Sequence, residues 1–189
     1  MTTLEVLAVI LGLACVGLTV RQHVACWPTG LAMVALYIVV FYRARLYSDM
    51  LLQVVYVALQ LYGWHAWVKR GPRRTGLAVS RLPRHTAAAW AVVCLVGTAA
   101  LGTVMHLRTD AALPYLDAFA TTASLIAQWL LGRKVLESWL VWIVVDVVSI
   151  GMYLAKELHL TAALYAVFLI LSFQGYRAWS RTRAVPAMG

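Results

Sequence analysis

Seven stretches of mostly apolar residues follow one another along the chain, separated by short polar or basic connections. They occupy residues 3–20, 24–42, 46–68, 86–107, 113–132, 138–156 and 160–179. A helix needs about 20 mostly apolar residues to cross a hydrocarbon core of about 30 Å. The pattern therefore predicts an all-α polytopic membrane protein with seven transmembrane helices.

The second half of the chain repeats the first half at a constant offset of 112 residues, without a gap. Trp27 then falls on Trp139, and Leu46 falls on Leu158. Each repeat spans three apolar stretches, and the stretch between them has no counterpart. One unpaired crossing gives both repeats the same direction, so the sequence predicts 3+1+3 parallel repeats related by an axis along the membrane normal. The expected parts are a first repeat, a basic cytoplasmic loop with a linker helix, a second repeat and a short basic tail: 1–68, 69–112, 113–180 and 181–189.

Composition supports the membrane assignment. Hydrophobic residues make up 63% and charged residues only 12% of the chain, and its mean hydropathy is +0.80, whereas a soluble domain has about 25% charged residues. The net charge of +9 does not indicate a nucleic-acid partner, because the basic residues lie between the apolar stretches. They are typical topology signals. Most of them, including the basic loop 69–85 and the pair Arg133 and Lys134, fall in connections on one side, which predicts an outside N-terminus and a cytoplasmic C-terminus.

The first apolar stretch is not expected to be a cleaved signal peptide. No positive region precedes it, and the segment 115–132 repeats it inside the chain.

The stretch 138–156 has a polar and aromatic face on which Asp146 lies near the helix centre. Positions three and four residues apart share one face of a helix, and a charge at the centre of a membrane helix costs roughly 2.5 to 3.5 kcal/mol. Asp146 therefore marks a functional site by default; the alternative is a structural carboxylate paired with a backbone group or a boundary cation. The candidate substrate-binding residues are Asp49, Gln53, Tyr56, Thr121, Gln128, Trp139, Trp142, Asp146, Tyr153 and Tyr165.

The polar residues differ between the two repeats, which indicates an asymmetric ligand. Asp146 falls opposite Val34, and Gln128 falls opposite Val16. Aromatic faces stack on rings or attract cations, and glutamine amides bond amides or hydroxyls. The expected ligand is flat and polar, and Asp146 would complement a positive charge on it. Three tryptophans near helix ends are instead expected in the interfacial belt: Trp67, Trp90 and Trp179.

Several other chemistries lack their motifs. The sequence has no Walker motif or glycine-rich phosphate loop, its cysteines form no C-x-x-C pair, and its histidines are scattered near helix ends. We expect no catalytic residue, no metal and no cofactor, and therefore no enzyme.

The order of these patterns along the duplicated chain resembles the PnuC family of vitamin transporters over nearly its whole length. The resemblance rests on Trp27-Pro28, Leu46-Tyr47-Ser48-Asp49 with Gln53 and Tyr56, Tyr62-Gly63-Trp64 with Trp67, Trp139 and Trp142 with Asp146, and Leu164-Tyr165 with Gly175 and Trp179. It implies a bacterial inner-membrane carrier of nicotinamide riboside that works by facilitated diffusion and depends on a cytoplasmic kinase to trap the substrate. It also implies a SWEET-like helix arrangement and a homotrimer. Thiamine, riboflavin and deoxynucleosides are alternative substrates within the family, and thiamine is also a flat cation.

The expected mechanism is alternating access, in which one three-helix repeat rocks against the other around a substrate near mid-membrane. Within transport, a proton-coupled carrier that uses Asp146 as its proton site is the main alternative. A non-transporting membrane scaffold or sensor is the alternative from another class. A channel is a weaker one, because the sequence shows no ring of repeated carbonyls or charges.

Overall fold

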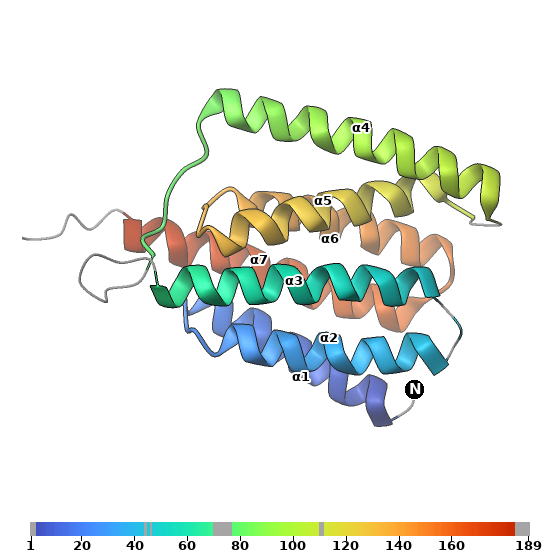
Figure 1. The fold of residues 1–189 in the computed structure, drawn as a ribbon, viewed down its shortest axis with the longest axis horizontal. Helices are drawn as coiled ribbons and strands as arrows, with labels where there is room; N and C mark the ends of the chain where they lie inside the picture. The colour runs from blue at the N-terminus through green and yellow to red at the C-terminus, as the bar shows by residue number, and fades with distance from the viewer. Residues whose placement is uncertain (1–2, 44, 46, 70–76, 110–111, 184–189) are drawn as a thin grey trace, which may run out of the picture. The chain divides into compact units, whose positions relative to one another are not determined.

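A computed structural model describes residues 3–43, 45, 47–69, 77–109 and 112–183 of the protein (Figure 1). Its described part is all-helical, as predicted, and its only extended pairing is an isolated bridge between Ser80 and Val135. Part of the predicted basic loop and most of the predicted tail lie outside the described residues. The helices are α1 (Thr3–Val20), α2 (Cys26–Arg43), α3 (Tyr47–Lys69), α4 (Arg84–Arg108), α5 (Pro114–Gly132), α6 (Ser138–Ala155) and α7 (His159–Arg183).

Five of these helices, α1, α2, α4, α6 and α7, are long and apolar enough to cross a membrane. The other two, α3 and α5, carry polar side chains along their length, including Gln53 and Gln60 in α3 and Asp117 and Gln128 in α5. A helix with such a polar side crosses a bilayer only where that side packs inside the protein or lines a cavity. The expectation of seven spans is thus confirmed for five helices.

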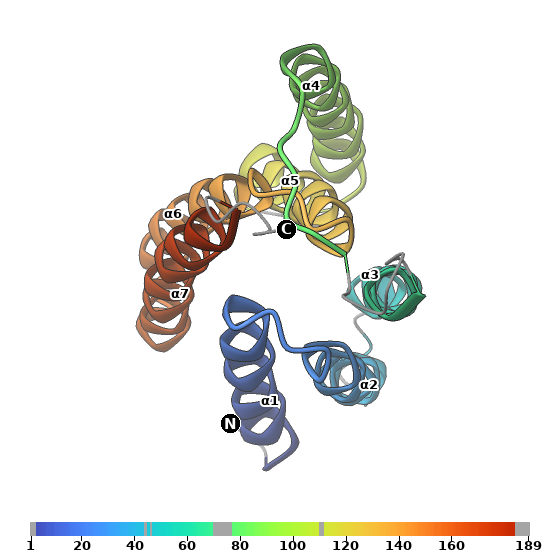
Figure 2. The same cartoon turned by 90° about the vertical axis from the view of Figure 1, so that its left-hand side faces the viewer.

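The chain divides into two compact units. The first comprises Met1–Ala78 with Gly132–Lys134, and the second comprises Val79–Leu131 with Val135–Gly189. In the first unit α2 lies between α1 and α3, and in the second α5 lies beside α4 and α6, with α7 against α6 (Figure 2). A hydrophobic cluster of the second unit joins α4, α5 and α6 with the segments before α4 and after α5: Leu82, Trp90, Cys94, Ile126, Trp129, Leu130, Val135 and Val141.

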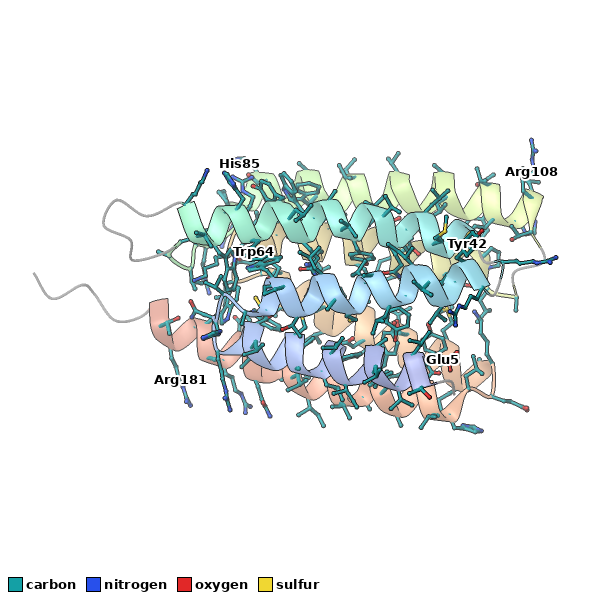
Figure 3. The ribbon with its side chains drawn as sticks, turned by 60° about the horizontal axis from the view of Figure 1, so that its bottom comes forward. Glu5, Tyr42, Trp64, His85, Arg108 and Arg181 are labelled. Carbon is teal, nitrogen blue, oxygen red and sulfur yellow. The ribbon has the colours of Figure 1, made fainter. Side chains whose placement is uncertain are left out.

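Successive helices within each unit run in opposite directions, as expected of a chain that crosses a bilayer repeatedly. In the first unit, Glu5 of α1 and Tyr42 of α2 lie at one end, and Trp64 of α3 lies toward the other (Figure 3). In the second unit, His85 near the start of α4 and Arg181 near the end of α7 lie at the same end. In the second unit, α4 therefore begins and α7 ends on the same side.

A residue with left-handed backbone conformation follows each of α1, α2, α5 and α6. The residues after α1 and α5 are 112 positions apart, and so are those after α2 and α6. Gln22 after α1 has φ 55° and Lys134 after α5 has φ 52°. The next residue in each turn donates its N–H five residues back, from His23 to Leu18 at 2.9 Å and from Val135 to Leu130 at 3.0 Å. A left-handed residue with these bonds satisfies the last carbonyls of a helix, so the two turns are built alike. Arg45 after α2 and Glu157 after α6, both at φ 58°, form a second pair at the same offset.

A tryptophan of α2 packs directly onto a glycine of α3 in the first unit. A Cβ on Gly63 would overlap the indole ring of Trp27, so the absence of a side chain allows the close approach of the two helices. The same ring meets Trp67 edge to face, with ring centroids 5.3 Å apart and planes at 83°. Edge-to-face packing is a preferred arrangement of aromatic pairs.

The same packing recurs in the second unit. A Cβ on Gly175 of α7 would overlap the ring of Trp139, and that ring meets Trp179 with centroids 5.4 Å apart and planes at 90°. The interfacial-belt prediction is therefore wrong for Trp67 and Trp179, which are 2% and 0% exposed. Their rings complete helix packing inside the units and do not face lipid.

Candidate functional site

The carboxylate of Asp146 is buried in the middle of α6. The residue is 2% exposed, and the hydroxyl of Ser172 on α7 donates to its Oδ2 at 3.0 Å. Among the described residues, no Lys, Arg or His side chain forms an ion pair with it. A buried charge is costly unless an opposite charge or several hydrogen bonds compensate it. The site thus has a buried carboxyl group with one neutral hydrogen-bond partner.

Sequence reasoning placed Ser172 on the polar face of the stretch 160–179 but did not include it among the candidate substrate-binding residues. Its pairing with Asp146 depends on the register between α6 and α7, which the tight turn after α6 sets. Glu157 is left-handed in that turn, and the N–H of Leu158 donates to the carbonyl of Tyr153 at 2.8 Å. A serine on a membrane helix gives no signal in sequence that distinguishes a partner for a carboxylate from a small packing residue.

Aromatic rings gather near the end of α6 and in the first half of α7. Tyr153 and Tyr165 have ring centroids 5.2 Å apart, and Tyr165 meets Phe168 edge to face at 5.9 Å. Tyr153 lies seven residues after Asp146 on the same helix face, which is about 10 Å along the axis at 1.5 Å per residue. All three rings are half-buried. They offer aromatic faces to a flat ring on the same side of α6 as the carboxylate.

An ion pair lies at the same end of the second unit. Lys156, just after α6, donates to both carboxylate oxygens of Asp117 in α5, at 3.1 and 3.2 Å. Sequence analysis treated Lys156 only as a basic residue in a connection. The structure shows that it ties the start of α5 to the end of α6 and so helps to position the helices that carry the candidate residues.

The remaining candidates of the second unit differ in burial. Gln128 of α5 is buried at 8% exposed, and Thr121 of α5 and Trp142 of α6 are half-buried. Trp139 packs between Trp179 and Gly175, as described above, and its indole N–H has no hydrogen-bond partner in the described structure. Gln128 and Trp142 therefore present polar and aromatic groups on α5 and α6, while the ring of Trp139 is taken up by helix packing.

The candidates of α3 belong to the first unit. Gln53 and Tyr56 are half-buried, whereas the side chain of Asp49 lies outside the described residues. Gln60, one turn after Tyr56, is 4% exposed and its Oε1 has no hydrogen-bond partner in the described structure. A Cβ on Gly30 of α2 would overlap the Gln60 amide. The glycine therefore makes room for a buried amide that sequence analysis placed on the same helix face as Gln53 and Tyr56 but did not include among the candidate substrate-binding residues.

Among the described residues, no group of three His, Cys, Asp or Glu side chains could hold a metal ion. Within the second unit, the buried carboxylate of Asp146, the tyrosine rings and the amide of Gln128 are the kinds of group that bind a flat, polar ligand.

Comparisons with known proteins point to one family. A family model described as nicotinamide mononucleotide transporter matches residues 2–181. The nicotinamide riboside transporter PnuC of Escherichia coli K12 is 27% identical over 201 residues, which cover 93% of this chain and 84% of that protein. The riboflavin/roseoflavin transporter RibM of Streptomyces davaonensis is 28% identical over 177 residues, which cover 90% of this chain and 81% of that protein.

A solved structure agrees with the sequence comparisons. The crystal structure of the vitamin B3 transporter PnuC superposes with a TM-score of 0.76 at 27% identity, and the match covers 95% of this chain and 81% of that one. The resemblance to PnuC that the sequence indicated is confirmed, and the relatives are transporters rather than enzymes. With a family match over nearly its whole length, the chain belongs to the nicotinamide mononucleotide transporter family.

Proposed function

We propose that this protein carries nicotinamide riboside across the bacterial inner membrane. The observation that supports this substrate is the Asp146 carboxylate, buried on α6 with Ser172 as its hydrogen-bond partner and with no ion-pair partner in the described structure. Nicotinamide riboside has a fixed positive charge on its ring nitrogen, and it also has an amide and ribose hydroxyls. A bound cation would supply the opposite charge that a buried carboxylate needs and that no side chain provides to Asp146 in the described structure.

The helices that carry the site would form two parallel three-helix repeats in a SWEET-like arrangement, with α4 as the linker. The matched left-handed turns and the matched Trp–Gly–Trp clusters at an offset of 112 residues support this duplication. Alternating access would then follow from rocking of one repeat against the other. The outside N-terminus rests on the distribution of basic residues, and the homotrimer rests on family resemblance.

Transport would be facilitated diffusion, with a cytoplasmic kinase that phosphorylates and traps the arriving substrate. Proteoliposomes that contain the purified protein test this directly. Uptake should stop when the internal concentration equals the external one, and an enclosed kinase with ATP should drive further accumulation. A pH gradient that drives accumulation without any kinase would instead favour the proton-coupled carrier with Asp146 as its proton site.

Riboflavin is a second candidate substrate, because the riboflavin/roseoflavin transporter RibM is 28% identical to this chain over 177 residues, against 27% over 201 residues for the PnuC protein of Escherichia coli. Riboflavin is flat and polar but has no fixed positive charge. Calorimetric titration of the purified protein with nicotinamide riboside, thiamine and riboflavin separates the candidates. Binding of nicotinamide riboside that exceeds the other two supports the proposal, and preferential binding of riboflavin or thiamine contradicts the substrate while leaving transport in place.

The scaffold or sensor hypothesis makes a different prediction. It requires that Asp146→Asn and Gln53→Ala leave the biological function intact, since neither substitution disturbs helix packing greatly. Loss of vitamin-dependent growth in cells that rely on this protein, with normal protein levels in the membrane, would exclude that hypothesis.

A further inference from the structure

One basic residue between α5 and α6 is buried. It lies in the connector, which is defined as residues 132–137, from the last residue of α5 to the residue before α6. Lys134 is 8% exposed, and its ammonium lies 4.4 Å from the ring centroid of Trp67 in α3. It also donates to the amide oxygen Oε1 of Gln22 at 3.2 Å. The neighbouring Arg133 is exposed, as a topology-determining cation usually is. Burial of Lys134 lowers its pKa below the ordinary value of a lysine, so the cation is held at a cost that its contacts must offset.

The first half of the connector packs with the first unit. Gly132–Lys134 belongs to that unit, although α5 itself belongs to the second. A Cβ on Gly132 would lie 3.4 Å from both the Cα of Gly63 and the ring of Tyr62 in α3, so the backbone of the connector approaches the backbone of α3 closely. Lys134 and Gly132 thus fix this short segment against α3 and the turn after α1.

The second half of the connector is held by the second unit. The N–H of Leu136 donates to the carbonyl of Ser80 at 2.9 Å, and the N–H of Leu82 donates to Oε2 of Glu137 at 2.8 Å. Arg81 adds an ion pair with Glu137 at 3.6 Å. The chain therefore enters the first unit at Gly132 and returns to the second unit at Val135.

We propose that Lys134 is a positioning residue for transport: through Trp67 and Gln22 it holds Gly132–Lys134 in place on the first unit during the transport cycle. The inference rests on the proposed function, because loss of this anchor changes uptake only if the protein is a carrier. An aromatic face and an amide, without a carboxylate, hold the cation firmly enough to order the segment. The anchor would set how fast the carrier changes state, and the substrate would be bound by other residues.

Hydrogen exchange followed by mass spectrometry tests the anchor without any substrate. In Lys134→Met, which keeps the side-chain stem but removes the charge, amides of the connector should exchange about ten-fold faster, as expected on loss of a desolvated cation–π contact. Arg133→Met is the matched control, because it removes the same charge from the same connector at an exposed position. It should change exchange there by less than about two-fold.

Transport kinetics test the role of the anchor in the cycle. Lys134→Met should lower the maximal uptake rate several-fold while the calorimetric Kd for nicotinamide riboside stays within about two-fold, and Lys134→Arg should restore most of the rate because it keeps a cation at the ring. Gln22→Asn, which suits the left-handed backbone but shortens the side chain, should produce a weaker form of the same defect if Lys134→Met does not fold.

Two results would overturn the proposal. Equal exchange and equal uptake in the Lys134 and Arg133 variants would show that Lys134 is only a topology signal, and a parallel loss of substrate affinity in Lys134→Met would make it a binding residue. Absence of vitamin uptake by the unmodified protein would count against the proposed function alone, since the exchange measurement does not depend on transport.

Discussion

Replacement of Asp146 by asparagine is the most informative perturbation of the candidate site. The two side chains have nearly the same shape, and the asparagine oxygen can still accept the 3.0 Å hydrogen bond from Ser172. The substitution therefore removes the negative charge and little else. If the carboxylate binds the cationic ring of the substrate, the variant should fold normally and bind nicotinamide riboside more weakly.

The magnitude follows from the burial of the carboxylate. Two unit charges about 5 Å apart attract each other by about 3 kcal/mol at an effective dielectric constant of about 20, the value that suits partly buried pairs. Asp146 is only 2% exposed, so solvent screens this attraction little. Desolvation of the substrate cation offsets part of it, which leaves about 2 kcal/mol, or about a 30-fold increase in Kd.

Calorimetry on the purified variant provides the assay, with riboflavin as the neutral comparison ligand. Asp146→Asn should weaken the binding of nicotinamide riboside about 30-fold and change any binding of riboflavin by less than about three-fold. Ser172→Ala is the companion variant and should lower the free energy of unfolding by about 1.5 to 3 kcal/mol, because it removes one hydrogen bond to a charged group but leaves the charge. An unchanged affinity of Asp146→Asn for nicotinamide riboside would refute an electrostatic role of the carboxylate.

The packing and surface contacts support further predictions. Gly63→Ala should lower the free energy of unfolding by about 2 kcal/mol or more, because its Cβ would overlap Trp27. Gly151→Ala is the control: its Cβ would meet nothing within 4 Å, so it should be neutral or stabilising by up to about 1 kcal/mol. Thermal unfolding in detergent compares the two variants, and equal losses of stability would contradict the packing argument. A double-mutant cycle of Asp117→Asn and Lys156→Met should give a coupling energy of about 0.5 to 1 kcal/mol. This coupling energy should shrink in high salt, since both side chains are about one-quarter exposed. A coupling energy that does not change with salt would count against a simple ion pair. Glu157→Gly should stabilise the protein by up to about 1 kcal/mol, because φ is 58° there, and a clear loss of stability would show that the Glu157 side chain contributes more than the backbone conformation costs.

The sequence predicted the helices well because their apolar stretches are long and the connections between them are short. The start of α6 at Ser138 and the end of α5 at Gly132 match the predicted bounds. The helices α3 and α5 also match their predicted bounds to within one residue, but their membrane spans stay predictions, because glutamines and an aspartate reduce their apolar character.

Contacts between helices could not be predicted, since they depend on register and rotation. Asp146 was identified from its position in an apolar helix and Ser172 from the polar face of the next one, but their hydrogen bond to each other was not predicted. Trp67 and Trp179 were assigned to the lipid interface because they lie near helix ends, whereas each packs against a second tryptophan in its own unit. Lys134 has the sequence signature of an ordinary topology signal, and only the structure shows that it is buried.

Uptake of labelled nicotinamide riboside into proteoliposomes that contain only this protein tests the central claim most directly. The account predicts saturable uptake that ends when the internal and external concentrations are equal and that falls strongly in Asp146→Asn at limiting substrate. Absence of uptake, in vesicles whose protein is folded and correctly inserted, would contradict the proposed substrate, and accumulation above the external concentration without a kinase would contradict facilitated diffusion.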